Sequence, residues 1–270
     1  MKKVVTLGPA GTYSEIATKK LLKKLEIDAK IIFEPSIDFC FERFKESDLL
    51  VLPLENSIDG YIQRTLDLLH QNTGYYISNE LSIPITFSLV SNEVSMEEIE
   101  TVYVQFKTQN QCLNFLHKYK HLKFIITDSN SQSLNLHLKN TKKSAAVIPT
   151  HLVTNKHQLV INKIEDGLIN QTRFVLIDKK LETVEKGTNI KALIVLSPTI
   201  DKPGLLYTLL GHFAKQNINL SSIMSRPKKD KLGTYHFFLE LNLSSDNLDD
   251  LLSTLRNSID LQIKLLGVYR

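Results

Sequence analysis

Three short segments of this 270-residue sequence hold residue types that could bind and transform a small anionic molecule. Gly8–Glu15 reads GPAGTYSE and leads from an apolar stretch into a helical pattern, so the amides of a helix N-terminus could hold a carboxylate. Pro53–Gly60 reads PLENSIDG and follows a fully apolar stretch. Asn170–Phe174 reads NQTRF, in which Thr172 offers a hydroxyl and Arg173 a guanidinium suited to a carboxylate. Nucleotide binding is not indicated, because the first segment is not GxGxxG and no Walker lysine follows it.

The polar residues of Pro53–Gly60 favour a functional interpretation. Asn56 and Ser57 can donate hydrogen bonds to a carbonyl or carboxylate, and Glu55 can orient or accept. A turn alone would explain asparagine, serine and glycine, but not Glu-Asn-Ser directly after a core strand. For the other two segments a structural alternative stays open: a plain βα turn capped by Ser14, and a strand start with a surface arginine.

The first two thirds of the sequence alternate short apolar runs with helical patterns, which predicts parallel sheets covered by helices. Strands are predicted over residues 3–7, 31–33, 49–52, 87–90, 102–104, 124–127, 145–148 and 175–177. Helical stripes are marked by Ala17, Leu21 and Leu25; Ile37, Phe41 and Phe44, with Ser36 as N-cap; Ile62, Leu66 and Leu69; Cys112, Phe115 and Leu116; and Leu134 and Leu138. Two α/β lobes with a cleft are expected, with ligands at the carboxyl ends of strands.

A different domain is predicted after residue 177. Residues 178–188 are polar and charged, as in a linker. Strands are then expected over 190–196, 220–225, 235–243 and 263–269, with helices over 205–216 and 248–255. This βαββαβ order is the ferredoxin-like plan. A unit of only ~80 residues is expected to gain stability by pairing with a copy of itself.

Composition excludes several classes of function. The net charge of +4 and the lack of a dense basic patch with aromatics argue against a nucleic-acid partner. The two cysteines, Cys40 and Cys112, form no disulfide framework and are expected to be buried thiols, and no CxxC or HExxH motif signals a metal. No apolar run approaches the ~20 residues of a membrane span. Gly8-Pro9 ends the first apolar run too early for a signal peptide, so a cytoplasmic location is expected.

These segments together resemble the prephenate dehydratase family, and the resemblance covers essentially the whole chain. The three segments above stand in the family's order and spacing, and Thr65–Leu69 (TLDLL) continues the match. The C-terminal unit resembles the ACT domain of that family through Asp201–Tyr207 (DKPGLLY) and Ser225–Pro227 (SRP).

The resemblance implies a carbon–oxygen lyase of L-phenylalanine biosynthesis that removes CO2 and hydroxide from prephenate to give phenylpyruvate, with no cofactor and no metal. Thr172 corresponds to the family's essential hydroxyl, which we interpret as a donor to the departing hydroxide, since threonine is too weak an acid to ionise. Phenylalanine is the implied feedback inhibitor, read by paired ACT domains in a homodimer or tetramer. The domains would be 1–180 for catalysis (lobe one about 1–78 plus 165–180, lobe two about 79–164), 181–188 as linker and 189–270 as ACT domain.

The resemblance also assigns candidate residues. The catalytic set is Thr172, Asn56, Glu55, Ser57 and Gln111; the substrate-binding set is Thr12, Tyr13, Arg173 and Phe174; the effector-binding set is Pro203, Gly204, Leu205, Leu206, Asn219, Leu220, Met224, Ser225 and Arg226. Two departures stand out: Val104 and Gln105 replace the family's serine and histidine, and Met224 replaces a glutamate, which predicts weaker effector binding.

Two rival functions remain. The same chemistry on arogenate would give phenylalanine directly. A non-catalytic, ligand-sensing binding protein would share the two-lobed α/β plan, but Glu55–Ser57 with Thr172 offers more polar chemistry than binding alone requires.

Overall fold

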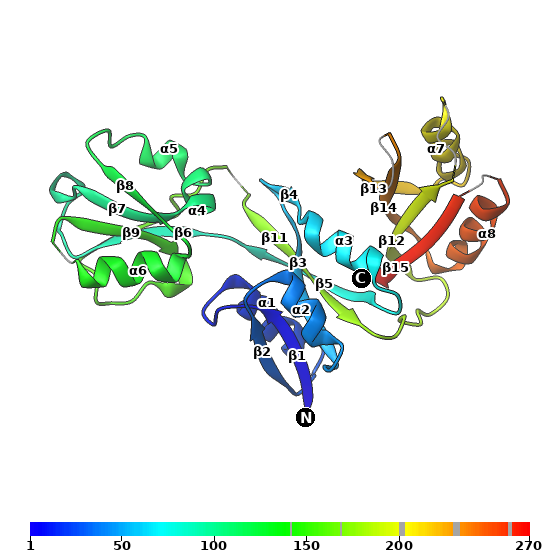
Figure 1. Ribbon diagram of the computed structural model, residues 1–270, viewed down its shortest axis with the longest axis horizontal. Helices are drawn as coiled ribbons and strands as arrows, with labels where there is room; N and C mark the ends of the chain where they lie inside the picture. The colour runs from blue at the N-terminus through cyan, green and yellow to red at the C-terminus, as the bar shows by residue number, and fades with distance from the viewer. Residues whose placement is uncertain (141, 168, 200–202, 229–232, 259–260) are drawn as a thin grey trace. The chain divides into compact units, whose positions relative to one another are not determined.

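The computed structural model describes residues 1–140, 142–167, 169–199, 203–228, 233–258 and 261–270. The chain forms two compact units (Figure 1). Unit 1 comprises Met1–Leu54, Ile62–Leu81 and Arg173–Arg270, and unit 2 comprises Glu55–Tyr61 and Ser82–Thr172. No helix in the described part of the chain is long and apolar enough to span a membrane.

The first part of unit 1 is a parallel α/β layer, as the sequence predicts. Strand β1 (Lys2–Leu7) pairs in parallel with β2 (Ala29–Glu34) and β3 (Leu49–Asn56). The connecting helices are α1 (Tyr13–Lys24), α2 (Ile37–Phe44) and α3 (Gln63–Gln71). Their predicted apolar stripes are confirmed, since residues such as Ala17, Leu21 and Phe44 are fully buried. The Oγ of Ser36 accepts the Phe39 amide at 3.3 Å and so caps α2.

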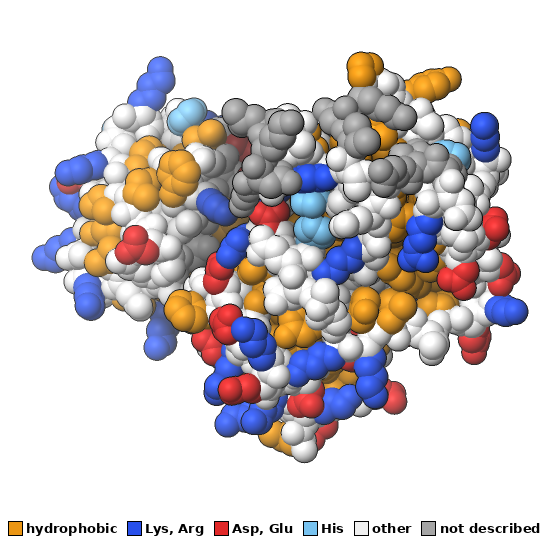
Figure 2. Space-filling view, turned by 45° about the vertical axis from the view of Figure 1, so that its right-hand side comes forward, with side chains coloured by type: hydrophobic (Ala, Val, Ile, Leu, Met, Phe, Trp, Pro, Cys, Tyr) orange, Lys and Arg blue, Asp and Glu red, His pale blue; other side chains and the backbone are white. Residues whose placement is uncertain are grey.

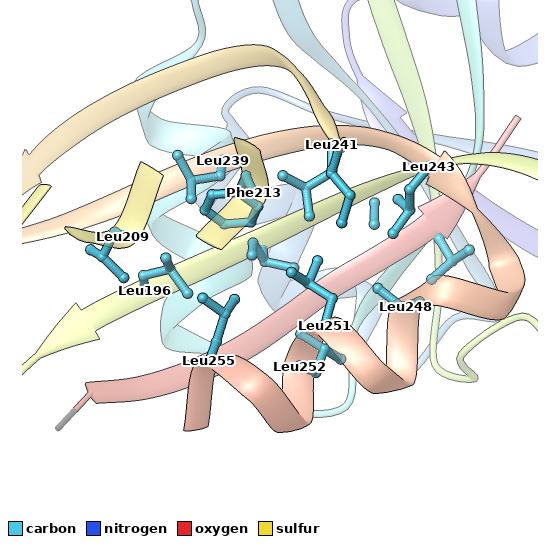
Figure 3. Close-up of a cluster of buried hydrophobic side chains, with 14 of the residues drawn as sticks. Leu196, Leu209, Phe213, Leu239, Leu241, Leu243, Leu248, Leu251, Leu252 and Leu255 are labelled. Atoms are coloured by element: carbon cyan, nitrogen blue, oxygen red, sulfur yellow. The ribbon is translucent and has the colours of Figure 1, made fainter. Parts of the chain in front are cut away.

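The second part of unit 1 has the predicted βαββαβ order. Its elements are β12 (Asn189–Pro198), α7 (Leu205–Lys215), β13 (Asn219–Pro227), β14 (Tyr235–Ser244), a 3-10 turn (Ser245–Asn247), α8 (Leu248–Ser258) and β15 (Leu261–Tyr269). The strand order β13-β14-β12-β15 is antiparallel and defines the ferredoxin-like sheet. Leucines of both helices pack with Phe213 against the strands (Figure 3).

The two parts of unit 1 share one continuous sheet, which no local sequence pattern predicts. Strand β15 pairs in parallel with β5 (Tyr76–Pro84) where Gly267 faces Ile77. A Cβ on Gly267 would lie 2.3 Å from the Ile77 carbonyl oxygen, so only glycine allows this approach. The order continues from β5 to β11 (Gln171–Asp178), β3, β1 and β2.

Unit 2 contains a second, mixed sheet of order β10-β6-β9-β7-β8. Its elements are β4 (Gly60–Tyr61), β6 (Phe87–Ser91), a 3-10 turn (Met96–Glu98), β7 (Thr101–Gln105), α4 (Phe106–Asn110), α5 (Leu113–Leu116), β8 (Lys123–Thr127), α6 (Asn130–Lys139), β9 (Ser144–Pro149), a 3-10 turn (Thr150–Leu152) and β10 (Leu159–Asn162). Val90, Ala146 and Ile148 form a buried core cluster within it.

Four local predictions need correction. The helix expected around Cys112–Leu116 is a single short turn, α5. The inner face of α6 presents Ser133 and His137, whereas the predicted core residue Leu138 is 49% exposed. Strands β5 and β10 were not predicted. Strand β3 continues through Asn56, so Glu55 and Asn56 belong to a strand rather than to a loop.

Candidate active site

Asn56 is the centre of a buried polar cluster in unit 2. It ends strand β3 and is only 6% exposed. Its Nδ2 lies 3.0 Å from Oγ1 of Thr172, 3.1 Å from Oδ1 of Asn170 and 3.1 Å from the carbonyl oxygen of Gln171. Strand β11 carries Thr172 and begins at Gln171, so pairing of the chain around β3 and β11 brings two sequence-predicted residues together.

The orientation of the Asn56 amide is fixed from its other end. Its Oδ1 accepts the backbone amides of Ile58 at 2.9 Å and Asp59 at 3.1 Å, closing the turn that follows β3. Because Oδ1 faces two N–H donors, Nδ2 must be the group that faces Thr172. The Thr172 hydroxyl oxygen therefore accepts from Asn56, which leaves its proton to be donated elsewhere.

The cluster extends through two further amides to a carboxylate. Asn170 Nδ2 donates to Oε1 of Gln111 at 3.0 Å, and Gln111 Nε2 donates to Oδ2 of Asp59 at 3.0 Å. Asn170 and Gln111 are 6% and 8% exposed. A chain of hydrogen bonds thus runs from Asp59 through Gln111, Asn170 and Asn56 to Thr172. Both Asp59 and Asn170 lie inside the motif segments, but the sequence alone does not single them out, since each is also an ordinary turn residue.

Ser57 and Glu55 have other roles in this structure. The Ser57 hydroxyl donates to the Ile169 carbonyl and accepts the Gln171 amide, both at 2.9 Å, so it links the turn after β3 to the start of β11. Glu55 pairs with Tyr61 of β4, and strand alternation directs it to the face of β3 opposite to Asn56. Glu55 therefore lies outside the chain of amides, and a catalytic role for it stays a prediction.

Arg173 and Phe174 are engaged within unit 1. The Nη1 of Arg173 lies 2.6 Å from Oε2 of Glu240 and 3.1 Å from Oε2 of Glu80, and its side chain is 11% exposed. The guanidinium of Arg173 does bind carboxylates, as the sequence predicts, but these two belong to the protein itself. Phe174 is 2% exposed and is a core residue. Substrate contacts by either residue stay predictions.

The Gly8–Glu15 segment is a turn that opens helix α1 in unit 1. Thr12 is the N-cap residue and Tyr13 begins the helix. Ser14 lies inside the helix and is 7% exposed, so the alternative of a Ser14 cap is wrong. Glu15 reaches back, and its Oε2 accepts the Gly11 amide at 2.6 Å. The expected cleft that would bring Thr12 and Tyr13 to one ligand with Thr172 stays a prediction.

The two unusual residues at the end of β7, Val104 and Gln105, are explained by local structure. Val104 is fully buried in the strand. Gln105 is the N-cap of α4, and its Oε1 accepts the Thr108 amide at 3.0 Å. The side chains that replace the family's serine and histidine therefore stabilise the strand and the helix that lead to Gln111.

Thiol and metal chemistry find no support among the described residues. Cys40 and Cys112 are free and buried. Burial raises the pKa of Cys40 to about 12 and raises that of Cys112 as well, so neither is a thiolate at neutral pH. The described residues include no cluster of three or more His, Cys, Asp or Glu that could hold a metal.

The effector candidates lie around the start of helix α7 and along strand β13, with Asn219 and Leu220 at its beginning and Ser225 and Arg226 near its end. Gly204 is the N-cap of α7 with φ +81°, a conformation that favours glycine. Asn219 and Ser225 are exposed on β13. Around them, Pro203 and Leu206 are exposed, Leu205 is buried, and Leu220 and Met224 are half-buried; Asp201 and Lys202 lie outside the described residues.

Arg226 of the Ser-Arg-Pro motif is bound to helix α3. Its Nε and Nη2 meet Oδ1 and Oδ2 of Asp67 at 3.0 and 2.6 Å, and its Nη1 lies 2.6 Å from Oε1 of Gln63. This bidentate pair is mostly buried, at 17% and 14% exposure. The geometry makes Arg226 a link to α3, and a direct contact with an effector stays a prediction.

The fold and the buried cluster define a class: a two-lobed α/β domain of the periplasmic-binding-protein type, followed by a ferredoxin-like ACT domain. The sequence model described as prephenate dehydratase matches residues 4–182, and that of the ACT domain matches residues 193–258. The chain belongs to the prephenate dehydratase family.

Individual relatives match over the full length. The chain is 36% identical to the prephenate dehydratase of Methanocaldococcus jannaschii, across 99% of this chain and 98% of that protein. Identity to the prephenate dehydratase of Bacillus subtilis is 27%, again across 99% and 98%. Among solved structures, the Staphylococcus aureus prephenate dehydratase matches with a TM-score of 0.83 at 28% identity, covering 99% of this chain and all 100% of that one. The Arthrobacter aurescens prephenate dehydratase in complex with L-Phe matches with a TM-score of 0.84 at 25% identity, covering 99% of this chain and 89% of that one.

Proposed function

We propose that this chain is a carbon–oxygen lyase that converts prephenate to phenylpyruvate, CO2 and water. The hydrogen bond from Asn56 to Thr172 is the observation that carries the proposal. It gives the threonine oxygen an acceptor role toward the protein, so that its proton is available to the substrate. Family membership and the full-length relatives that carry this name support the same reaction.

The proposed chemistry needs one well-placed donor and no cofactor. As the bond to the ring carboxylate breaks, its electron pair enters the ring, the C–OH bond breaks, and the ring becomes aromatic. Negative charge develops on the departing hydroxyl, which the Thr172 hydroxyl stabilises by donating a hydrogen bond, and the departing hydroxide takes up a proton from solvent to become water. A hydroxyl that accepts a hydrogen bond is a stronger donor, so Asn56, whose amide is polarised by the two backbone N–H groups at its Oδ1, would strengthen Thr172.

Substrate binding in this proposal uses the start of helix α1. The helix begins at Tyr13 after the N-cap Thr12, and the partial positive charge of this helix end favours a carboxylate. Arg173 supports strand β11 in this proposal, because Glu80 and Glu240 meet its guanidinium, and its contact with substrate stays a prediction.

A spectrophotometric assay for phenylpyruvate tests the reaction. The chain is expected to release phenylpyruvate from prephenate faster than it releases phenylalanine from arogenate. The reverse preference would make it an arogenate dehydratase, and ligand binding without turnover of either compound would make it a binding protein.

We further propose that phenylalanine binds the ACT domain and lowers activity. The neighbour crystallised with L-Phe supports this. The exposed effector candidates on β13 and the start of α7 would meet the ligand between two paired copies. Strand β15 is already paired with β5 at Gly267, which leaves β13 as the edge of the ferredoxin-like part of the sheet through which a homodimer, or a tetramer built as a dimer of dimers, would form.

Calorimetry with L-phenylalanine and light scattering test the regulatory part. An Asn219→Ala variant suits the calorimetry better than a change at Gly204, whose positive φ would strain any other residue. In calorimetry, we expect the intact chain to bind L-phenylalanine with a measurable heat and the Asn219→Ala variant to bind it more weakly. In light scattering, we expect the intact protein to have the mass of at least two chains. A monomer that takes up no phenylalanine would leave the ACT domain without this role.

The domain boundaries and location belong to the same proposal. The matched family ranges end at residue 182 and resume at 193, which supports a linker near 181–188 and an ACT domain over 189–270. Unit 2 supports a second lobe near 79–164.

A cytoplasmic location is supported by the two free cysteines, which suit a reducing compartment. Basic and acidic side chains are interspersed on the face seen in Figure 2, which gives no support to a nucleic-acid partner.

A further inference from the structure

A carboxylate of the ACT domain holds the arginine that follows Thr172. Glu240 of β14 is only 3% exposed, and its Oε2 lies 2.6 Å from Nη1 of Arg173. The hydroxyl of Tyr269 donates to the same Oε2 at 3.1 Å, and that of Ser221 donates to Oε1 at 3.0 Å. Three donors thus fix the position of this buried carboxylate.

A second carboxylate holds the same guanidinium from the neighbouring strand. Oε2 of Glu80 on β5 lies 3.1 Å from Nη1 of Arg173, and its Oε1 lies 2.6 Å from Nζ of Lys191 on β12. Burial and the nearby Glu240 raise the pKa of Tyr269 well above its usual value, so its hydroxyl remains a donor. Two positive and two negative groups therefore balance in this cluster.

Stability alone is a weak explanation for such a cluster. Removing charges from water costs several kcal/mol per ion, and well-packed apolar residues often stabilise a fold as well as a buried ion pair does. What the ion pair adds is a defined geometry for the groups it joins. Here that group is strand β11, in which Arg173 directly follows Thr172.

We propose that Glu240 is a positioning residue for catalysis, which acts through Arg173 to hold the start of β11, and therefore the Thr172 hydroxyl, in place. This inference rests on the proposed function. It makes the ACT domain a structural part of the catalytic strand. A different explanation would be that Glu240 only helps to attach the ACT domain to the rest of unit 1.

The matched control is the ion pair between Asp67 and Arg226. It also joins the ferredoxin-like part of unit 1 to the α/β part, and it is similarly buried, but it touches α3 and not β11. Steady-state kinetics on prephenate would compare the wild-type chain with Glu240→Gln, Arg173→Gln, the double variant and Asp67→Asn. Hydrogen exchange of the amides in residues 171–174 would be measured in the same proteins.

Glu240→Gln and Arg173→Gln are each expected to lower kcat on the order of 10- to 100-fold, the scale for a small misplacement of a reacting group. KM should stay within about twofold, since these changes do not alter the contacts that bind the substrate in its ground state. The double variant should be no slower than the slower single variant, because both changes remove one interaction. Exchange at residues 171–174 should accelerate in these variants and not in Asp67→Asn, which should keep the wild-type kcat.

Wild-type kcat in a folded Glu240→Gln chain would overturn the inference, as would an equal loss of kcat in Asp67→Asn. If Glu240→Gln does not fold, Tyr269→Phe removes one donor from the same carboxylate without a charge change, and a wild-type kcat there would also overturn it. A wild-type chain that does not turn over prephenate would refute the proposed function instead. The exchange comparison would then decide the positioning role by itself.

Discussion

At the scale of single residues, the site depends on which way one amide points. Asn56 is held at Oδ1 by two backbone amides, so its Nδ2 must face Thr172 and Asn170. The sequence identifies Asn56, Gln111 and Thr172 as candidates from their motifs. It does not identify Asn170 or Asp59, because their part in the chain of hydrogen bonds depends on pairings between residues 52 and 114 positions apart.

Exchanging the Asn56 amide for a carboxylate should remove the donor and keep the turn. In Asn56→Asp the side-chain oxygens can still accept the Ile58 and Asp59 amides, but nothing donates to Thr172, whose proton would turn toward the new carboxylate. We expect kcat to fall by about 10²-fold, as for other lost donors that stabilise charge. Thermal unfolding checks that the turn survives. Normal turnover in a folded Asn56→Asp chain would show that the amide does not prepare the threonine.

A buried histidine should make the fold sensitive to acid. Burial, and then the nearby His157 ring, lower the pKa of His137 to about 4. Between pH 6.5 and 4 the unfolded chain binds the proton and the folded chain does not. The contribution of His137 to stability is therefore fully present above pH 6.5 and is lost as the pH falls toward 4.

The His137→Asn variant isolates this effect. An asparagine can keep the 2.9 Å hydrogen bond that His137 Nδ1 forms with Ser144 Oγ, but it does not titrate. Chemical unfolding at several pH values between 7 and 4 should show a shallower loss of stability for the variant than for the wild type. Parallel curves would mean that His137 is not a source of the acid sensitivity.

At the scale of elements, most helices and strands follow from local patterns, and the exceptions have physical causes. Strand β3 extends past its apolar run because β4 pairs with Glu55 and Asn56. Helix α6 turns His137 inward because its ring finds a partner in Ser144, which leaves Leu138 exposed. The pairing of β15 with β5 at Gly267 and Ile77 has no local signal in the sequence, because these two residues are 190 positions apart in the chain.

Helix α3 should carry the effector signal if phenylalanine binds as proposed. Arg226 lies in the Ser-Arg-Pro motif and forms a bidentate ion pair with Asp67 of α3. Helix α3 follows the turn at Asn56 and strand β4 in the chain. Asp67→Asn should weaken inhibition by phenylalanine at least ~5-fold, the lower end of usual coupling, while activity without phenylalanine is kept. Activity measured against phenylalanine concentration, with calorimetry to verify binding, tests this. Unchanged inhibition would place the coupling elsewhere.

At the scale of the whole molecule, unit 1 joins the ACT domain to the α/β lobe far more closely than a domain on a linker requires. Strand β15 pairs with β5 and so joins the two parts of the sheet. Glu240 of the ACT domain forms an ion pair with Arg173, and Lys191 of the ACT domain forms one with Glu80. The sequence predicts both domains correctly as folds. It could not predict their shared sheet, because the linker composition suggests independence.

A chain cut after Ile177 should consequently be much less stable than the intact protein. The cut exposes the edge of β5 and leaves Arg173 and Glu80 without their ACT partners, and breaking buried charge pairs typically costs ~3–5 kcal/mol. Chemical unfolding of the shortened and intact chains measures the difference. A shortened chain of undiminished stability and activity would show that the lobe does not need the ACT domain.

The role of the Thr172 hydroxyl is tested by the rate of phenylpyruvate formation from prephenate by the wild-type chain and by Thr172→Val. Valine keeps the shape and β-branching of threonine but cannot donate a hydrogen bond. We expect rapid turnover by the wild type, a kcat lower by about 10²–10³-fold in the variant, and little change in KM. A Thr172→Val chain as fast as the wild type would show that the Thr172 hydroxyl, although it accepts a hydrogen bond from Asn56, does not assist the departure of the ring hydroxyl.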